Sequence, residues 1–298
     1  MKHLLRISDA PVKEIVQEAE LLNPDCNLPE VFRKKTLITF FNEPSTRTRM
    51  SMEAAMHHLG GRVISASDAK NSTSIKKGES FKDTIRVISR YGDVLAIRDS
   101  DANWIETAQE YSEIPCINAG NGGDEHPTQA LLDLYTMWRK FGKSWENLKN
   151  LRVLFLGDLR YGRTVHSLVP LLRQCGCNIS YAPAAVFADY SKSYLEYKQR
   201  SPEENSYDIN EVDTKNYDVL YFTRIQHERI EMDIRGEMMF TLFDLNNMKQ
   251  DAIVMHPLPR GPEISREIDK DPRAVYFTDQ IKNGVIVRAA IIKMLLGL

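Results

Sequence analysis

The feature that most constrains the fold is a repeated change between short apolar, β-branched runs and longer runs with helical spacing. The segment from Lys35 to Phe41 is apolar and β-branched, Thr46 to Leu59 has its apolar residues at helical spacing, and Arg62 to Ser65 begins a second extended run. Gly60 and Gly61 end the helical run, as glycine often does. These segments predict one βαβ unit.

The same alternation continues through the rest of the chain. Further helices are predicted over Phe81 to Ser89, Pro127 to Phe141, Arg163 to Cys175 and Ile281 to Leu296, and further strands over Asp93 to Ile97, Leu151 to Leu156, Asn178 to Ala182, Tyr217 to Phe222 and Asp251 to Met255. The polar, turn-rich segment from Gly142 to Asn150 suggests a nearby domain boundary. We therefore expect an α/β protein of two Rossmann-like domains, each a parallel sheet flanked by helices.

Composition narrows the class of protein. A chain of 298 residues with 42% hydrophobic content is long enough for two domains with separate cores, and a net charge of -2 gives no basic field for nucleic acid. The first ten residues mix charged and apolar side chains, and the longest apolar run is far too short to span a bilayer. We expect a soluble, cytoplasmic protein that contacts neither nucleic acid nor membrane. The cysteines Cys26, Cys116, Cys175 and Cys177 form no Cys-x-x-Cys pair, so reduced thiols are expected rather than a zinc site.

The densest group of anion-binding residues is Ser45-Thr46-Arg47-Thr48-Arg49, between a predicted strand and a predicted helix. Free backbone N–H groups and the dipole at a helix N-terminus attract anions, and arginine binds phosphate oxygens in a bidentate fork. The alternative is a helix cap by Ser45 with two solvated arginines, but this accounts for only one of the hydroxyls. The segment lacks the Gly-x-x-x-x-Gly-Lys pattern of a nucleotide P-loop, so it predicts another kind of anion site.

Two further segments place polar side chains at predicted helix starts. The motif His126-Pro127-Thr128-Gln129 follows a predicted loop from Asn118 to Glu125 and places His126 at a helix N-cap, where the dipole favours a neutral imidazole. A neutral histidine can donate a hydrogen bond to a carbonyl oxygen, although a purely capping role is the alternative. Lys76-Lys77-Gly78-Glu79 is expected to begin another helix, where cations oppose the macrodipole unless an anion offsets them; a flexible surface loop is the alternative.

Arginines recur after predicted strands in both halves. Arg98 follows one strand, Arg163 follows the predicted loop from Gly157 to Gly162, and Arg224 follows another strand with Gln226 close behind. Open α/β sheets bind ligands at the carboxyl ends of their strands. The arginines therefore predict a strongly anionic ligand that bridges the two domains.

One more loop follows a strand, and its composition is unusual. His256-Pro257-Leu258-Pro259-Arg260 contains two prolines, which stiffen the backbone and remove amide donors. Its carbonyl groups could accept hydrogen bonds from a ligand amide, and a structural turn is the alternative.

Together, the motifs Ser45 to Arg49, His126 to Gln129 and His256 to Arg260 resemble the aspartate/ornithine carbamoyltransferase family in order and in spacing. The similarity extends from about Leu5 to the last helix. The lysine pair and the late motif resemble the aspartate-specific members, since the ornithine-specific members typically have a cysteine in the late motif. One departure is Thr73, followed by Ser74, where other members have a serine four residues before the active-site lysine.

The resemblance implies a carbamoyl-phosphate-binding domain over 1–137 plus 283–298 and an aspartate-binding domain over 138–282. It implies an active site in the interdomain cleft and at the subunit interface of a homotrimer, with a separate regulatory chain as a possible partner. The implied reaction carbamoylates L-aspartate with carbamoyl phosphate, an early step of pyrimidine biosynthesis, and needs no cofactor and no metal.

The resemblance also assigns residues. It implies catalytic roles for Arg47, Thr48, Arg98, His126 and Lys77, the last from a neighbouring subunit. For carbamoyl phosphate it implies Ser45, Thr46, Arg47, Thr48, Thr73, Ser74, Arg98, His126, Gln129 and the carbonyl groups of Leu258 and Pro259. For aspartate it implies Lys77, Arg163, Arg224 and Gln226, and it gives Glu43 the role of bracing arginines.

Three other functions remain open from the sequence. A carbamoyltransferase for ornithine or an ornithine derivative is the nearest, but Arg163 and Arg224 favour a dicarboxylate acceptor. A nucleotide-dependent dehydrogenase with tandem Rossmann-like halves would need a Gly-x-Gly-x-x-Gly turn, which the segment from Gly157 to Arg163 lacks. A non-catalytic anion-binding subunit would be expected to have an incomplete set of site residues.

Overall fold

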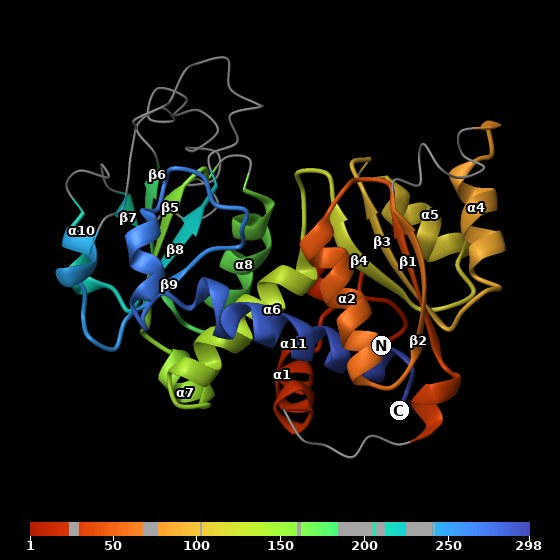
Figure 1. Ribbon diagram of the computed structural model, residues 1–298, viewed down its shortest axis with the longest axis horizontal. Coiled ribbons are helices and arrows are strands. Elements are labelled where there is room, and N and C mark those ends of the chain that lie inside the picture. Colours follow the sequence, from red (N-terminus) through yellow and green to blue (C-terminus); the bar gives the residue numbers. More distant parts are fainter. Residues whose placement is uncertain are drawn as a thin grey trace. The chain divides into compact units, whose positions relative to one another are not determined.

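The computed structural model describes residues 1–23, 30–67, 77–101, 103–159, 162–183, 205–206, 212–224, 240 and 242–298. The chain divides into two compact units, one formed by Met1–Tyr135 with Lys282–Leu298 and the other by Thr136–Ile281 (Figure 1). The division falls inside helix α6 (Pro127–Lys140) and inside helix α11 (Asp279–Leu295). In the described part of the chain, no helix has the length and apolar character needed to cross a membrane.

The first unit, hereafter unit 1, is built on a four-stranded parallel sheet in the order β2-β1-β3-β4. Its strands are β1 (Thr36–Phe41), β2 (Arg62–Ser67), β3 (Val94–Asp99) and β4 (Cys116–Asn121). Its helices are α1 (Val12–Leu21), α2 (Thr46–His58), α4 (Phe81–Ile88), α5 (Trp104–Tyr111), the first part of α6 and most of α11, with short 3-10 turns at Ile7–Asp9 and Glu30–Lys34.

Alternation along the strands of unit 1 puts different side chains on the two faces of its sheet. Ile38 and Phe40 of β1 pack with Ile85 of α4 and Ile105 of α5 in one buried cluster. Thr39 points the other way, and its hydroxyl donates to Glu53 of α2 over 3.2 Å. The sheet is thus covered by α4 and α5 on one face and by α2 on the other.

The second unit, hereafter unit 2, is built on a five-stranded parallel sheet in the order β7-β6-β5-β8-β9. Its strands are β5 (Arg152–Gly157), β6 (Asn178–Pro183), β7 (Asn205–Ser206), β8 (Val219–Thr223) and β9 (Ile253–Met255). Its other elements are α7 (Trp145–Leu148), α8 (Arg163–Gln174), α10 (Leu242–Asn246) and 3-10 turns at Thr214–Asn216, Arg266–Lys270 and Val275–Phe277.

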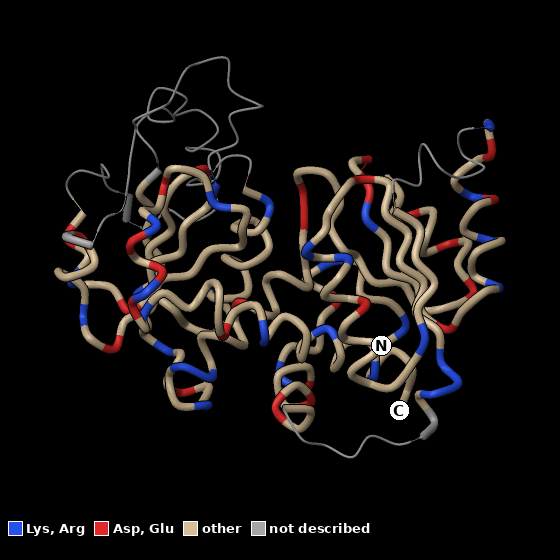
Figure 2. Tube along the Cα trace, in the orientation of Figure 1, with Lys and Arg blue, Asp and Glu red and all other residues tan. Residues whose placement is uncertain are grey.

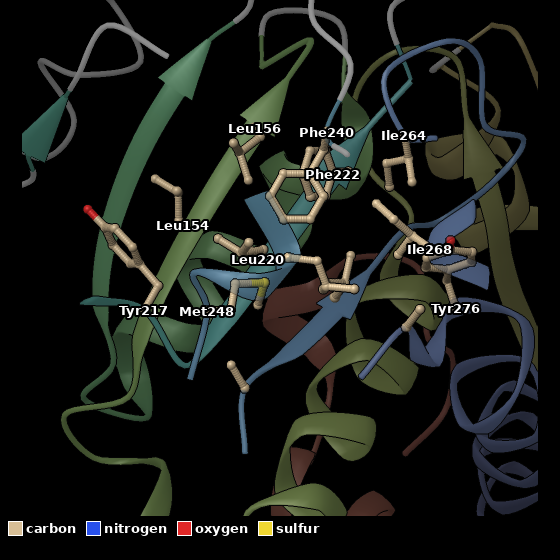
Figure 3. Close-up of a cluster of buried hydrophobic side chains, with 14 of the residues drawn as sticks. Leu154, Leu156, Tyr217, Leu220, Phe222, Phe240, Met248, Ile264, Ile268 and Tyr276 are labelled. Carbon is tan, nitrogen blue, oxygen red and sulfur yellow. The ribbon is translucent and has the colours of Figure 1, made fainter. Parts of the chain in front are cut away.

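A cluster of buried apolar side chains covers one face of the unit 2 sheet (Figure 3). Leu156 and Phe222, from the ends of β5 and β8, lie beside Phe240, whose ring centroid is 5.0 Å from that of Phe222. Ile264, Ile268 and Tyr276 extend the cluster past β9. In both units basic and acidic residues are interspersed along the chain (Figure 2).

The fold class predicted from the alternation is confirmed, because both sheets are parallel and flanked by helices. The predicted strands and helices are present, with ends that differ by one or two residues. Inside the turn-rich segment from Gly142 to Asn150 lies the short helix α7.

Three local predictions were wrong. Strand β3 continues to Asp99, so Arg98 lies in the strand instead of following it. The expected loop from Asn118 begins as strand β4, because the Asn118 side chain satisfies nearby backbone by donating to the Leu5 carbonyl and accepting from Gly120 N–H. Helix α4 begins at Phe81 and not within the lysine motif, because Ser80 is its N-cap and accepts from Asp83 N–H over 3.1 Å.

Candidate active site

The carboxyl ends of β1, β3 and β4 meet at one edge of the unit 1 sheet, as parallel strands must. Phe41 at the end of β1 pairs in register with Arg98, and Asp99 pairs with Asn121 at the end of β4. The segments that leave these strands carry the Ser45–Arg49 motif and His126. The residues predicted to bind the phosphate and the carbonyl oxygen therefore lie at one edge of one sheet.

Helix α2 begins with its anion-binding features available. Ser45 occupies the N-cap position with extended backbone, but its side chain makes no capping hydrogen bond, and the first turn contains no acidic residue. The interpretation of this motif as a plain serine cap is therefore wrong. Thr46 and Arg47 are exposed, whereas Thr48 is buried.

The two arginines of the motif have different surroundings. Arg49 donates to the Ser65 hydroxyl of β2 over 3.4 Å and lies 3.9 Å from the Glu53 carboxylate. Arg47 lies exposed in the first turn of α2. The structure thus assigns Arg49 to the packing of α2 on β2, and leaves Arg47 as the motif's arginine at the helix start.

Arg98 is a buried cation with an acidic partner. Its Nη2 donates to Glu43 Oε1 over 2.7 Å and its Nη1 donates to the Ala119 carbonyl over 3.3 Å. The pairing offsets the cost of burying the guanidinium. The backbone also fixes this contact, because Asn42 N–H donates to the Arg98 carbonyl over 2.8 Å.

His126 holds the N-cap position predicted for it. Its carbonyl accepts from Gln129 and Ala130 N–H groups at the start of α6, and its side chain is buried. Its ring Nε2 lies 3.4 Å from the Thr48 hydroxyl of α2. Two predicted carbonyl-polarising groups from distant parts of the sequence are thus brought together.

Gln129 lies in the first turn of α6 and is largely buried. Its Nε2 donates to Oδ1 of Asp133, one helical turn further on, over 3.0 Å. Sequence reasoning missed Asp133, although a Gln–Asp pair at this spacing on a helix is a recognisable signal.

Lys77 lies apart from this group in its own chain. It is exposed, three residues before the cap of α4, and makes no ion pair with a described residue. Thr73 and Ser74, which precede it, lie outside the described residues, as does Lys76. Glu79 accepts a hydrogen bond from Thr84 of α4 over 2.8 Å, so it belongs to the packing of that helix.

In unit 2 the two predicted aspartate ligands follow adjacent strands. Arg163 is the first residue of α8, which follows β5, and Arg224 comes directly after β8; both are half-buried. The strand ends approach so closely that a Cβ on Gly157 would lie 2.3 Å from the Thr223 carbonyl oxygen, which only glycine permits. Gln226 lies outside the described residues.

The loop after β9 is fixed by two buried side chains. Leu258 N–H donates to His256 Nδ1 over 2.8 Å, so the ring hydrogen is on Nε2 and is donated to Glu263 Oε1, also over 2.8 Å. Glu263 accepts a further hydrogen bond from Gly261 N–H over 2.6 Å. Leu258 has a positive φ of 57° and its bond to Pro259 is cis.

The side chains of His256 and Glu263 with their hydrogen bonds are hereafter called the unit 2 clamp, and these bonds also set the charge of Glu263. Burial acts to raise the pKa of Glu263, but the hydrogen bonds from His256 and from Gly261 N–H outweigh it, so the carboxyl has a pKa below its usual value. Arg260 is engaged elsewhere, with its Nη2 donating to Asp269 over 2.6 Å. Sequence reasoning missed Glu263, which no local pattern marks as the partner of His256.

No group of three or more His, Cys, Asp or Glu residues in the described ranges is arranged to hold a metal ion. The ligands gathered at the unit 1 edge are hydroxyl, guanidinium and imidazole groups. Such donors suit an anion, and they suit a carbonyl oxygen that gains negative charge.

Comparison with known proteins agrees with this chemistry. The profile of the family described as "Aspartate/ornithine carbamoyltransferase, carbamoyl-P binding domain" matches residues 2–139, and that of its "Asp/Orn binding domain" matches residues 149–295. A curated relative from Thermococcus onnurineus, an aspartate carbamoyltransferase catalytic subunit, is 43% identical over 93% of this chain and 89% of its own length.

Solved structures give the same result. The catalytic subunit of M. jannaschii aspartate transcarbamoylase is 39% identical, with a TM-score of 0.86 over 100% of this chain and 98% of that one. Aspartate transcarbamoylase from Trypanosoma cruzi, solved with carbamoyl phosphate and aspartate, is 31% identical, with a TM-score of 0.83 over 98% of this chain and 95% of that one. This chain therefore belongs to the aspartate/ornithine carbamoyltransferase family.

Proposed function

We propose that the chain transfers the carbamoyl group of carbamoyl phosphate to the amino group of L-aspartate, giving N-carbamoyl-L-aspartate and phosphate. The observation that carries the proposal is the unit 1 edge, where the start of α2, the buried Arg98–Glu43 pair and the Thr48–His126 contact come together. The names of the relatives support aspartate over ornithine as the acceptor.

The phosphate end of the donor carries about two negative charges. The N–H groups at the start of α2, the hydroxyls of Ser45, Thr46 and Thr48, and Arg47 form a suitable receptor for it. Arg98 adds a cation that Glu43 keeps in a fixed position. This receptor needs no nucleotide and no metal.

The carbamoyl carbonyl is polarised by Thr48, Arg98 and His126. The neutral amine of aspartate attacks the carbonyl carbon, the C–N bond forms and the carbonyl oxygen becomes an oxyanion. Prearranged donors stabilise such an oxyanion by about 3–4 kcal/mol each. The C–O bond to phosphate then breaks, and the leaving phosphate takes the proton from the amine.

The acceptor is assigned to unit 2. Arg163 and Arg224 follow adjacent strands, and two guanidiniums suit the two carboxylates of aspartate and would repel the cationic side chain of ornithine. Lys77 and Gln226 are assigned to aspartate as well. The carbonyl groups of Leu258 and Pro259 are assigned to the carbamoyl NH2, and Thr73 or Ser74 to the phosphate.

We assign 1–137 plus 283–298 as the carbamoyl-phosphate-binding domain and 138–282 as the aspartate-binding domain. The division of the chain into two compact units supports these bounds, and the descriptions of the two family profiles support the ligand of each domain. The exposed position of Lys77 supports a homotrimer in which this residue completes the site of a neighbouring subunit. Inactive Arg47→Ala and Lys77→Ala chains, mixed and reassembled, should then regain activity. Absence of recovery in verified mixed trimers would contradict the shared site.

We also propose that the enzyme acts in pyrimidine biosynthesis and in the cytoplasm. Deleting the gene should make growth depend on an added pyrimidine. Added N-carbamoyl-L-aspartate should remove that dependence. Localisation of a tagged chain by microscopy tests the compartment.

The reaction itself is tested by measuring phosphate release from carbamoyl phosphate with purified protein, comparing L-aspartate with L-ornithine. Release with aspartate alone is expected. Release with ornithine alone would keep the phosphate receptor but overturn the acceptor, and release with neither would overturn the proposed reaction.

A further inference from the structure

The side chain of Gln129 has one end already engaged. Its NH2 group donates to the Asp133 carboxylate over 3.0 Å, and a carboxylate oxygen can only accept. The amide therefore cannot reverse without losing this bond and placing its own oxygen against the carboxylate. Its carbonyl oxygen Oε1 is left as the acceptor that Gln129 can offer to a ligand.

Asp133 is fully buried, which is costly for a carboxylate unless opposite charge and hydrogen bonds compensate it. Arg288 of α11, also buried, supplies the opposite charge. Burial lowers the pKa of Arg288 to about 10, and the Asp133 carboxylate acts in the opposite direction. A guanidinium with this pKa remains protonated at neutral pH, so the charge on Asp133 is compensated.

Arg288 also reaches the helix that carries the phosphate motif. Its Nη1 donates to the Ser51 hydroxyl of α2 and to the Gly284 carbonyl, both over 3.0 Å. A Cβ at Gly284 would lie 2.8 Å from this nitrogen, so glycine leaves space for the guanidinium. Behind the α2 and α6 motifs there are thus two hydrogen-bonded polar pairs, the half-buried Ser51 with Arg288 and Gln129 with Asp133, and the charges of Arg288 and Asp133 act on each other.

Resting on the proposed function, we propose that Asp133 is a positioning residue that directs the Gln129 carbonyl toward the carbamoyl NH2 and so makes the enzyme select a donor that carries N–H at this point. Carbamoyl phosphate and acetyl phosphate differ there only by NH2 against CH3. A reversed amide would present its NH2 to the NH2 of the donor, leaving two donors without an acceptor. Sites that hydrogen-bond a substrate group discriminate strongly against analogues lacking it.

The test compares Asp133→Leu, which removes the acceptor for the Gln129 NH2 group, with the wild-type enzyme. The measurements are kcat/KM for carbamoyl phosphate, followed by formation of N-carbamoyl-L-aspartate, and the inhibition constant of acetyl phosphate against carbamoyl phosphate. We expect kcat/KM to fall about 10- to 100-fold, the effect of leaving one polar group unsatisfied. The inhibition constant of acetyl phosphate should change less than about threefold, because its methyl group makes no such bond.

A parallel loss for both ligands, or no loss for either, would overturn the proposal, since a general structural defect affects both phosphates alike. Asp93→Leu is the matched control: Asp93 is a partly buried carboxylate bonded to Lys35 over 3.0 Å, just before the amino end of β3. This variant should leave both constants unchanged.

If Asp133→Leu does not fold, the double variant Asp133→Leu with Arg288→Gln removes both buried charges together and avoids an uncompensated guanidinium. The same selective loss is expected from it, and a wild-type preference for carbamoyl phosphate would overturn the proposal. A wild-type protein that forms no N-carbamoyl-L-aspartate would instead overturn the proposed function.

Discussion

Units 1 and 2 are both parallel sheets with candidate ligand groups beyond their strand ends, but they hold these groups by different means. In unit 1 three of the groups are side chains that each contact another side chain: Arg98 contacts Glu43, His126 contacts Thr48 and Gln129 contacts Asp133. In unit 2, in addition to the side chains of Arg163 and Arg224, the loop after β9 offers main-chain carbonyls. Buried side chains of His256 and Glu263 fix it by binding its amide groups.

This difference separates two kinds of defect. A substitution in the unit 1 set should change how a ligand is bound while the backbone keeps its course. A substitution in the unit 2 clamp should first alter the backbone, and therefore stability, before it alters chemistry. Four experiments test this division, beginning with the largest expected effect.

Arg47→Ala should lower kcat/KM by at least about 10³-fold, the scale at which loss of a cation on a transferring phosphate group is felt. The side chain is exposed, so the free energy of unfolding should stay within about 0.5 kcal/mol of wild type. Phosphate-release kinetics and urea denaturation measure the two quantities. Arg49→Ala is the control from the same motif, and an equal loss of activity there would remove the distinction drawn between the two arginines.

His256→Ala should destabilise the protein by about 2–4 kcal/mol, because Glu263 loses its imidazole donor while staying buried. A shift of the urea midpoint measures it. Lys215→Ala is the control: its ion pair with Asp213 is exposed and should contribute less than about 1 kcal/mol. Equal midpoints for His256→Ala and wild type would show that the clamp does not hold this loop.

Arg224→Gln should raise KM for L-aspartate about 10- to 100-fold, the usual cost of removing a charge-assisted pair. The dissociation constant of carbamoyl phosphate should not change, because that ligand is assigned to unit 1. Initial-rate kinetics with each substrate varied separately distinguish these effects. Arg152→Gln, at the amino end of β5 in the same sheet, is the control and should leave both constants unchanged.

The smallest effect concerns pH. Hydrogen bonds hold the folded pKa of Glu263 below its usual value of 4.5, against the opposing effect of burial. The resulting stability is present above about pH 4.5 and is lost as the pH falls through the lower folded pKa. The difference in unfolding free energy between wild type and Glu263→Gln should therefore shrink from pH 7 to pH 3. A constant difference across this range would contradict the charge assigned to Glu263.

Much of this arrangement could be predicted from the sequence, because strand–helix alternation and helix-start motifs are local patterns. Pro127 marked the first turn of α6 and so placed His126 at its N-cap, which is confirmed. Ser80 and Asp83 gave an equally local signal for the start of α4.

Strand β4 could not be found by propensity. Asn118, Gly120 and Asn121 are poor strand formers, and their polar groups are satisfied by contacts with one another and with the distant Leu5. The role of Arg288 could not be predicted either, because its contact also joins residues far apart in the sequence. Its partner Ser51 lies 237 positions earlier, and no window of sequence contains both.

The Arg288–Ser51 contact also has a consequence for synthesis. Unit 2 is an insertion within unit 1, so the ribosome makes all of unit 2 between Ser51 and Arg288. At 5–20 residues per second this interval is about 10–50 s. During that time α2 and α6 have been made without the buried guanidinium, and Asp133 has no Arg288 to compensate its charge. This buried part of unit 1 is therefore completed only after unit 2 has been translated.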